Sequence, residues 1–256
     1  MGQKVNPICL RLGIRKTVQK DWASGDWTSM WFAPSKQLFV KYLQQDRHIR
    51  EFMKKELSSA AVARIIIQRS PEYVRVVTHT ARPGVLIGRR GENIQRLQEA
   101  VQKTVGPGQQ LKMDYVEITN PYIEAQLIAE SIGFQLEKRI AYRRAMKRAI
   151  QQAMEAGAKG IKIICNGRLA GSEMKRQETY RDGKVPLGTL RADLDFGQAT
   201  AHTTAGCIGM KVWVYRGDVV QLKPSTGAEE GAAKVQPHAG PRAKAPDASL
   251  AAQAAS

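Results

Sequence analysis

The segment Gly88-Arg89-Arg90-Gly91 is the short motif with the clearest chemistry in this chain of 256 residues. Glycine has no Cβ, so a turn built on two glycines can be tight and can bring its backbone close to a ligand. The two arginines between them carry forked guanidinium groups that suit a phosphate. In a chain with 22 glycines the same motif also fits an ordinary connecting turn, so the flanking elements must decide.

The segments on either side of this turn have the patterns of regular elements. Tyr73–His79 is rich in β-branched residues and predicts a strand, and residues 82–87 predict a short helix because Pro83 suits a first helical position. Residues 92–105 carry apolar side chains at helical spacing. Two helices joined by a glycine turn and set on a sheet form the clamp by which KH domains hold single-stranded nucleic acid. A plain connecting turn remains the alternative interpretation.

The charge of the chain also favours a nucleic-acid partner. There are 40 Lys and Arg residues against 23 Asp and Glu, which gives a formal net charge of +17. From Ser225 to the end the basic and acidic residues balance, so the whole excess lies in the preceding part. A soluble protein with this excess needs an anionic partner, and RNA or DNA is the commonest one.

The patterns divide the chain into four segments. Residues 1–34 predict an extended arm without sustained periodicity, and residues 35–119 predict the KH domain, which begins with a helix capped by Ser35. Further strands are predicted at Ala63–Gln68 and Leu111–Thr119. Residues 120–220 predict a second domain, and residues 221–256 predict a disordered tail because they offer little large apolar surface to bury.

The second domain is predicted to be an α+β domain. One long helix is expected from about Tyr122 to Glu155, followed by strands at Gly160–Asn166, Thr189–Phe196 and Cys207–Tyr215. The segment Arg181-Asp182-Gly183-Lys184 predicts a hairpin turn. The expected architecture is a long helix on a mostly antiparallel sheet.

The predicted long helix carries the densest basic segment of the chain. At about 100° per residue, the basic side chains gather on one half of the helix and small or apolar side chains on the other. The basic set is Arg139, Arg143, Arg144, Lys147 and Arg148. Like charges four residues apart repel, so this arrangement favours contact with phosphates over a merely solvated face. A lesser basic group follows in the second domain: Arg168, Lys175, Arg176, Arg181, Lys184 and Arg191.

Signals of an enzyme, a metal site or a membrane segment are missing from the sequence. Cys9, Cys165 and Cys207 are far apart, and the four histidines have neither metal-ligand spacing nor an evident nucleophile partner. No phosphate-binding loop of the nucleotide-hydrolysing type occurs, and no apolar run approaches the length of a membrane span. We therefore expect a cytoplasmic, non-enzymatic protein without a cofactor.

Several longer stretches, in the same order along the chain, resemble one known family. They are Met1–Pro7 with Arg11-Leu12-Gly13, His79–Gly84 before the glycine turn, Arg143–Ala149, Gly157–Ile161, Val185-Pro186-Leu187 and Thr189–Asp193. These stretches resemble the third protein of the bacterial small ribosomal subunit, from Met1 to about Val220. The resemblance implies a type II KH domain followed by the family's C-terminal α+β domain.

The resemblance also implies partners and roles. It places the chain on the ribosome, bound to ribosomal RNA in the head of the small subunit and next to small-subunit proteins ten and fourteen. The positions matching Arg143, Arg144 and Lys147 line the channel through which messenger RNA enters and help to open messenger helices. The residues expected to bind ribosomal RNA are Gln3, Lys4, Arg11, Arg15, Lys16, Arg168, Lys175, Arg176 and Arg191. A free KH-type regulator that binds single-stranded RNA is the alternative.

Overall fold

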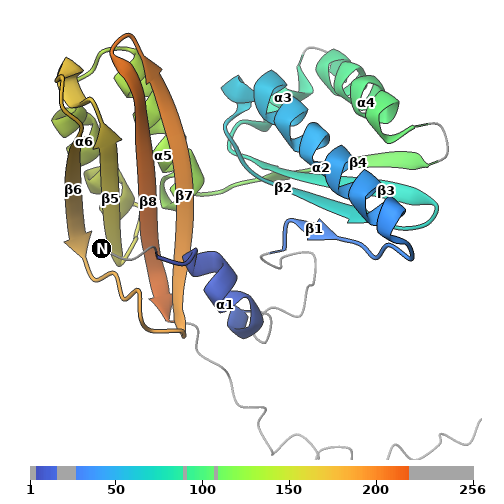
Figure 1. Cartoon of the computed structure of the whole chain (residues 1–256), viewed down its shortest axis with the longest axis horizontal. Helices are drawn as coiled ribbons and strands as arrows, with labels where there is room; N and C mark the ends of the chain where they lie inside the picture. Colours follow the sequence, from blue (N-terminus) through green and yellow to red (C-terminus); the bar gives the residue numbers. More distant parts are fainter. Residues whose placement is uncertain (1–3, 16–26, 89–90, 107–108, 219–256) are drawn as a thin grey trace, which may run out of the picture. The chain divides into compact units, whose positions relative to one another are not determined.

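The computed structural model describes residues 4–15, 27–88, 91–106 and 109–218. The described residues form two four-stranded sheets, each with its own helices and hydrophobic core (Figure 1). Among them, no helix has the length and apolar character needed to span a membrane. The predicted tail lies outside the described residues.

After one short strand that the sequence does not predict, the first sheet has the predicted KH order of elements. Its elements are β1 (Ser29–Met30), α2 (Lys36–Glu56), β2 (Val62–Arg69), β3 (Tyr73–Thr80), α3 (Pro83–Ile87), α4 (Glu92–Val105) and β4 (Gln110–Glu117). The strand order is β1-β2-β3-β4, with β2 and β3 antiparallel and β3 and β4 parallel. The cap on α2 is confirmed, because the Ser35 hydroxyl accepts a hydrogen bond from the Leu38 amide at 3.3 Å.

The core of this sheet follows from the periodicities of its elements. Helices α2 and α4 contribute residues one turn apart, such as Ile49 with Met53 and Leu97 with Val101, and all four are buried. They pack against alternate residues of β2 and β3, of which Ile67 is fully buried. The helical spacing and the strand spacing both place their apolar residues in the same core. This part of the fold could therefore be predicted from local patterns.

Strand β1 and its anchor lie in the segment predicted as an extended arm. The Asp46 carboxylate of α2 is fully buried and accepts hydrogen bonds from the Ser29 hydroxyl at 2.9 Å and the Trp31 indole at 2.8 Å. Its other oxygen pairs with Arg69 of β2 at 2.7 Å. A buried charge requires such partners. This cluster fixes β1 beside β2, a contact that no local pattern indicates.

The second sheet is fully antiparallel, with strand order β6-β5-β8-β7. Its strands are β5 (Gly160–Gly167), β6 (Arg176–Gly183), β7 (Ala192–Thr203) and β8 (Gly206–Asp218), and the preceding helices are η4 (Pro121–Ile123), α5 (Ala125–Glu137) and α6 (Tyr142–Glu155), with η5 (Leu169–Gly171) between β5 and β6. Both α5 and α6 pack on one face of the sheet around a shared core. The predicted α+β class is confirmed.

The prediction of a single long helix over residues 122–155 is wrong. Helix α5 ends at Glu137, Arg139 takes a left-handed backbone with φ of 60°, and α6 begins at Tyr142. A left-handed backbone carries a steric cost for residues other than glycine. Because Arg139 occupies this position, the sequence has no glycine that would mark the break. The break allows both helices to pack on the same sheet face, which one straight helix of this length cannot do.

The hairpin predicted at residues 181–184 is also wrong. Gly183 does adopt a positive φ of 67°, yet it ends β6, and the chain then crosses to β7 at the opposite edge of the sheet. The glycine supplies the turn geometry that the pattern indicates. The pairing partner of β6 is β5, and only the tertiary fold selects it.

The first turn of α5 is held by residues far away in sequence. Asp195 of β7 accepts a hydrogen bond from the Ala125 amide at 2.8 Å, and Arg216 of β8 pairs with Glu124 at 2.7 Å. Burial raises the pKa of the Glu124 carboxyl. A Cβ on Gly197 would lie 2.3 Å from the Ala125 backbone, so glycine is required for this close approach.

Helix α1 (Pro7–Arg15) lies within the predicted extended arm and contacts β7. Arg11 is 1% exposed, and its guanidinium donates hydrogen bonds to the carbonyls of Leu187 and Thr189 at 2.7 and 2.9 Å. The same guanidinium donates hydrogen bonds to the Pro7 and Pro186 carbonyls, at 3.1 and 3.4 Å. Two nitrogens of the Arg11 guanidinium are thus used inside the fold, where they attach α1 to the connection before β7. The contact of Arg11 with ribosomal RNA stays a prediction.

Candidate nucleic-acid interface

The cationic side chains of α6 are exposed, and the opposite side of the helix is packed. Arg143, Arg144 and Lys147 are all exposed. The packed side is made of small and flexible residues that contact the sheet: Ala145, Met146, Ala149 and Ala153. The predicted division into a basic and a buried half is thus present for Arg143, Arg144 and Lys147, whereas Arg139, predicted on the same face, lies before α6 begins.

The break before α6 puts two of these cations at a helix N-terminus. Ala141 is the N-cap, so Arg143 and Arg144 lie in the first turn, which contains no acidic residue. The N-terminus of a helix carries a partial positive charge and orphan N–H groups, so cations there are unfavourable and anions are favoured. Backbone dipole and side-chain charge therefore attract the same kind of ligand at this point.

The immediate surroundings of these cations provide little neutralisation. Arg143 donates a hydrogen bond to the Tyr142 hydroxyl at 3.1 Å, and that bond raises the pKa of its guanidinium, with a smaller contribution from Glu178 of β6. Within the described ranges, neither Arg144 nor Lys147 forms an ion pair. The face keeps its positive charge for an external anion.

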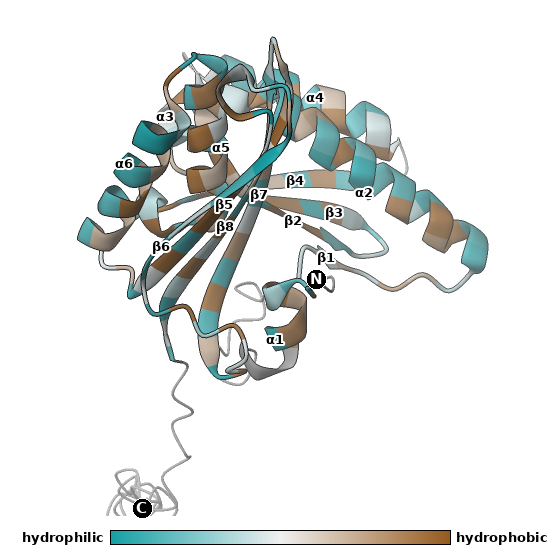
Figure 2. Ribbon diagram, turned by 60° about the vertical axis from the view of Figure 1, so that its left-hand side comes forward, coloured by the Kyte–Doolittle hydropathy of each residue, from teal (hydrophilic) through white to brown (hydrophobic). Residues whose placement is uncertain are grey.

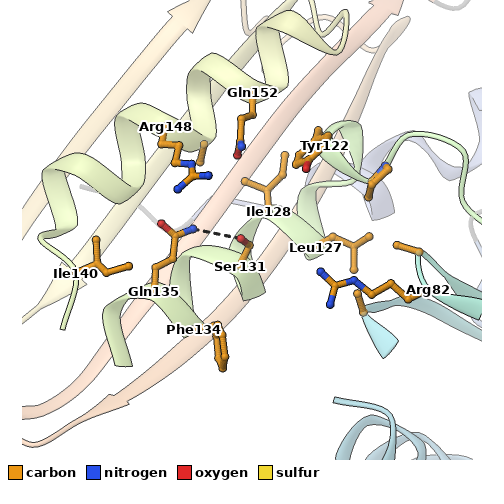
Figure 3. A pocket seen from close by; sticks show the side chains of 14 residues that line it. Arg82, Tyr122, Leu127, Ile128, Ser131, Phe134, Gln135, Ile140, Arg148 and Gln152 are labelled. Atoms are coloured by element: carbon orange, nitrogen blue, oxygen red, sulfur yellow. Dashed lines mark hydrogen bonds between the residues drawn. The ribbon is translucent and has the colours of Figure 1, made fainter. Parts of the chain in front are cut away.

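Arg148 has a different environment from the other cations of α6. Together with Gln152 it lines a pocket whose α5 side includes Ser131 and Gln135 (Figure 3). The Gln135 amide donates a hydrogen bond to the Ser131 hydroxyl at 3.3 Å across this surface. Arg148 is therefore directed toward α5, and the outward cations of α6 are Arg143, Arg144 and Lys147.

The glycine turn joins α3 to α4 as predicted. Gly88 and Gly91 have φ values of 71° and 79°, a region in which side chains are strained. A Cβ on Gly88 would also lie 2.6 Å from the side-chain amide nitrogen of Asn93. Both glycines are therefore needed for the turn, while Arg89 and Arg90 lie outside the described residues.

The residues expected to bind ribosomal RNA are placed in different environments. Lys4, Lys175 and Arg176 are exposed. Arg168 is exposed but donates to the Ser172 and Ala205 carbonyls at 2.9 and 3.0 Å, so it also joins two loops.

The remaining members of that set add little free charge in the described structure. Arg191 lies 3.6 Å from Asp218 in an exposed ion pair. Gln3, Lys16 and the side chain of Arg15 lie outside the described residues.

Sequence reasoning missed two cations of the second sheet. Lys162 is the only charged residue of β5, and four apolar or aromatic residues separate Lys211 from Arg216 in β8, so no charge cluster marks either lysine. They are neighbours only because β5 pairs with β8, where Ile164 lies opposite Lys211 and Lys162 opposite Trp213. The period-2 alternation of each strand is the one sequence signal that puts them on the same face.

Within the described ranges no cluster of three or more metal-ligating side chains occurs.

Comparison with known proteins matches both halves of this architecture. Residues 48–122 match the KH domain model, and residues 132–214 match the model of the ribosomal protein S3 C-terminal domain. The small ribosomal subunit protein uS3 of Beijerinckia indica is 49% identical to the chain over 224 residues, which cover 88% of each protein. The chain belongs to the uS3 family.

Two further members of the uS3 family are equally similar. The uS3 protein of Methylacidiphilum infernorum is 49% identical over 216 residues, covering 84% of this chain and 96% of the relative. That of Rhodospirillum centenum is 49% identical over 224 residues, covering 88% and 94%. The uS3 proteins are structural constituents of the small ribosomal subunit and not enzymes. Membership therefore favours the ribosomal role over that of a free KH-type regulator.

Proposed function

We propose that this uS3-family chain binds ribosomal RNA in the head of the small subunit and presents α6 to messenger RNA. In this proposal Arg143, Arg144 and Lys147 contact messenger phosphates where the message enters, and they help to position the message and open its helices. The observation that carries the proposal is the set of three exposed cations in the first two turns of a helix that lacks a first-turn acid. Such contacts recognise the RNA backbone and are insensitive to base sequence.

Ribosomal RNA contacts are assigned to other parts of the chain. Lys4, Lys175 and Arg176 are exposed and available, and the glycine turn supplies a close-approach surface between α3 and α4. Small-subunit proteins ten and fourteen are the proposed protein neighbours. The proposed location is the cytoplasmic ribosome.

The test compares two triple variants in assembled ribosomes. Arg143→Ala, Arg144→Ala and Lys147→Ala together should leave sedimentation with small subunits nearly unchanged and slow translation through a stable messenger hairpin. The matched control is Lys54→Ala, Lys55→Ala and Lys103→Ala, which removes three exposed cations from α2 and α4. The control should pass the hairpin at the normal rate, and equal hairpin transit by both variants would refute the role of α6.

A further inference from the structure

The second sheet has one face that its helices do not cover. Helices α5 and α6 pack against the residues whose side chains point to the shared core, such as Ile163 of β5 and Met210 of β8. By alternation, the intervening residues point to the other side, and the strand ribbons accordingly change between hydrophilic and hydrophobic along their length (Figure 2). We call this side the open face. Its members, read from the strand register, are Gln177, Thr179 and Arg181; Lys162, Ile164 and Asn166; Cys207, Gly209, Lys211 and Trp213; and Phe196, Gln198, Thr200 and His202.

One end of the open face is closed by the chain itself. Leu194 and Tyr215 are buried there against Val185 and Leu187, in the region where Arg11 attaches α1. Away from that end the side chains become exposed, including those of Arg181, Lys211 and Gln198. The uncovered surface therefore extends over four strands, a width of about 14 Å at the usual strand spacing.

The charge of the open face has one sign. Lys162 lies directly opposite Arg181 in the register, and Lys211 lies opposite Ile164, next along β5 on the same face. No member of the open face is acidic. Burial and the nearby charges of Lys4 and Arg181 lower the pKa of the Lys162 ammonium. The repulsion among these cations is not relieved within the face, so its complement is an anion.

The remaining side chains suit a nucleic acid better than a simple anion. Phe196 and Trp213 form an aromatic pair with ring centroids 5.3 Å apart, and the Lys162 ammonium lies 5.5 Å from the Trp213 ring. Trp213 is buried, and Phe196 is partly exposed at the edge of this pair. Exposed amides, Asn166, Gln177 and Gln198, add donors and acceptors. Cations, amides and an aromatic edge on one sheet face match the phosphates, ribose hydroxyls and bases of RNA.

We propose that the open face is a second RNA-binding surface, on which one RNA strand lies across β6, β5, β8 and β7 and is held by Arg181, Lys162 and Lys211. The proposal rests on the proposed RNA-binding function but uses a surface distinct from α6. An acidic protein segment is the competing occupant. The amides and the partly exposed Phe196 favour RNA, because they offer contacts to bases and ribose that an acidic peptide does not require.

The first test measures RNA affinity of the full chain with a labelled single-stranded RNA of about a dozen nucleotides. The variant Lys162→Gln, Arg181→Gln and Lys211→Gln should lower the affinity by about ten- to a hundredfold at moderate salt, since each phosphate contact on single strands contributes about 0.7 to the salt slope. The slope itself should fall by about two. The control Lys54→Gln, Lys55→Gln and Lys103→Gln should change both quantities much less. Equal losses in the two variants would overturn the proposal.

The second test identifies the occupant in assembled small subunits. A benzophenone-bearing residue at Gln198 should cross-link to RNA, and the same residue at Glu99 of α4 controls for accidental reaction. Cross-linking to a protein, or to nothing, would overturn the proposal. Messenger-hairpin transit by the open-face variant should remain normal, so failure here is distinguishable from failure of the proposed function of α6.

Discussion

Two groups of arginines in this chain have opposite surroundings. Arg11 and Arg69 are buried and hydrogen-bonded to backbone carbonyls or to Asp46, whereas Arg143 and Arg144 are exposed at the start of a helix. The residue type is the same, and all of them count equally in the net charge of +17. The difference shows that the net charge overstates the charge available to RNA, because part of it holds the fold together.

The largest expected effect lies at the buried ion pair. Asp46→Ala leaves the Arg69 guanidinium uncompensated in the core and removes the acceptor of Ser29 and Trp31. Breaking one partner of such a pair costs about 3–5 kcal/mol. Urea unfolding of the full chain, followed by tryptophan fluorescence, measures the loss.

The exposed pair on the same helix provides the control for that variant. Glu51 pairs with Arg47 at 2.7 Å, with both side chains in solvent. Glu51→Ala should hardly move the unfolding midpoint, because exposed ion pairs contribute little. Similar losses for Asp46→Ala and Glu51→Ala would remove the distinction between buried and exposed cations.

A somewhat smaller effect is expected at Arg11. Arg11→Met keeps the apolar stem but leaves the Leu187 and Thr189 carbonyls without their donor, and an unsatisfied buried polar group costs about 1–3 kcal/mol. Hydrogen exchange should accelerate in α1 and in residues 185–192 while the first sheet keeps its protection. Leu10→Ala, at an exposed position of the same helix, is the control and should change neither. Uniform acceleration over both sheets would show that Arg11 does not act locally.

The smallest expected effect on stability concerns the exposed cations of α6, and here the substitutions should stabilise the fold instead of destabilising it. Removing Arg143, Arg144 and Lys147 relieves repulsion at a positive helix end, whereas Lys54, Lys55 and Lys103 lie in the last turns of α2 and α4, where cations are favourable. The α6 triple alanine variant should therefore melt slightly higher than the matched control. The difference should shrink with added salt. A lower melting temperature for the α6 variant would mean that its cations stabilise the fold.

Much of the first sheet could be predicted from local patterns, and less of the second. The Ser35 cap, the β-branched residues of Tyr73–His79 and the helical stripe from Leu97 to Val101 each indicate their element independently. In the second sheet, the break at Arg139 has no glycine or proline to signal it. The cap on α5 comes from Asp195, seventy residues away. Local sequence propensity carries no information on contacts between residues that lie this far apart in the sequence.

The candidate surfaces divide in the same way. The one-sided charge of α6 follows from helical periodicity alone, because residues on one helix keep a fixed angular relation. Its position at a helix N-terminus required the tertiary structure, since packing on a common sheet face is what separates α5 from α6. The open face could be recognised only once the pairing of three strands was known, because Lys162, Arg181 and Lys211 come from β5, β6 and β8.

Local sequence patterns were enough to predict the KH order of elements, the glycine turn, the excess of positive charge and the amphipathic character of α6. Each of these depends on neighbours within a few residues, where spacing fixes geometry. Which cations form bonds inside the fold and which remain exposed could be learned from the three-dimensional structure alone. That outcome depends on burial and strand pairing, which join residues such as Arg11 and Leu187 across most of the chain.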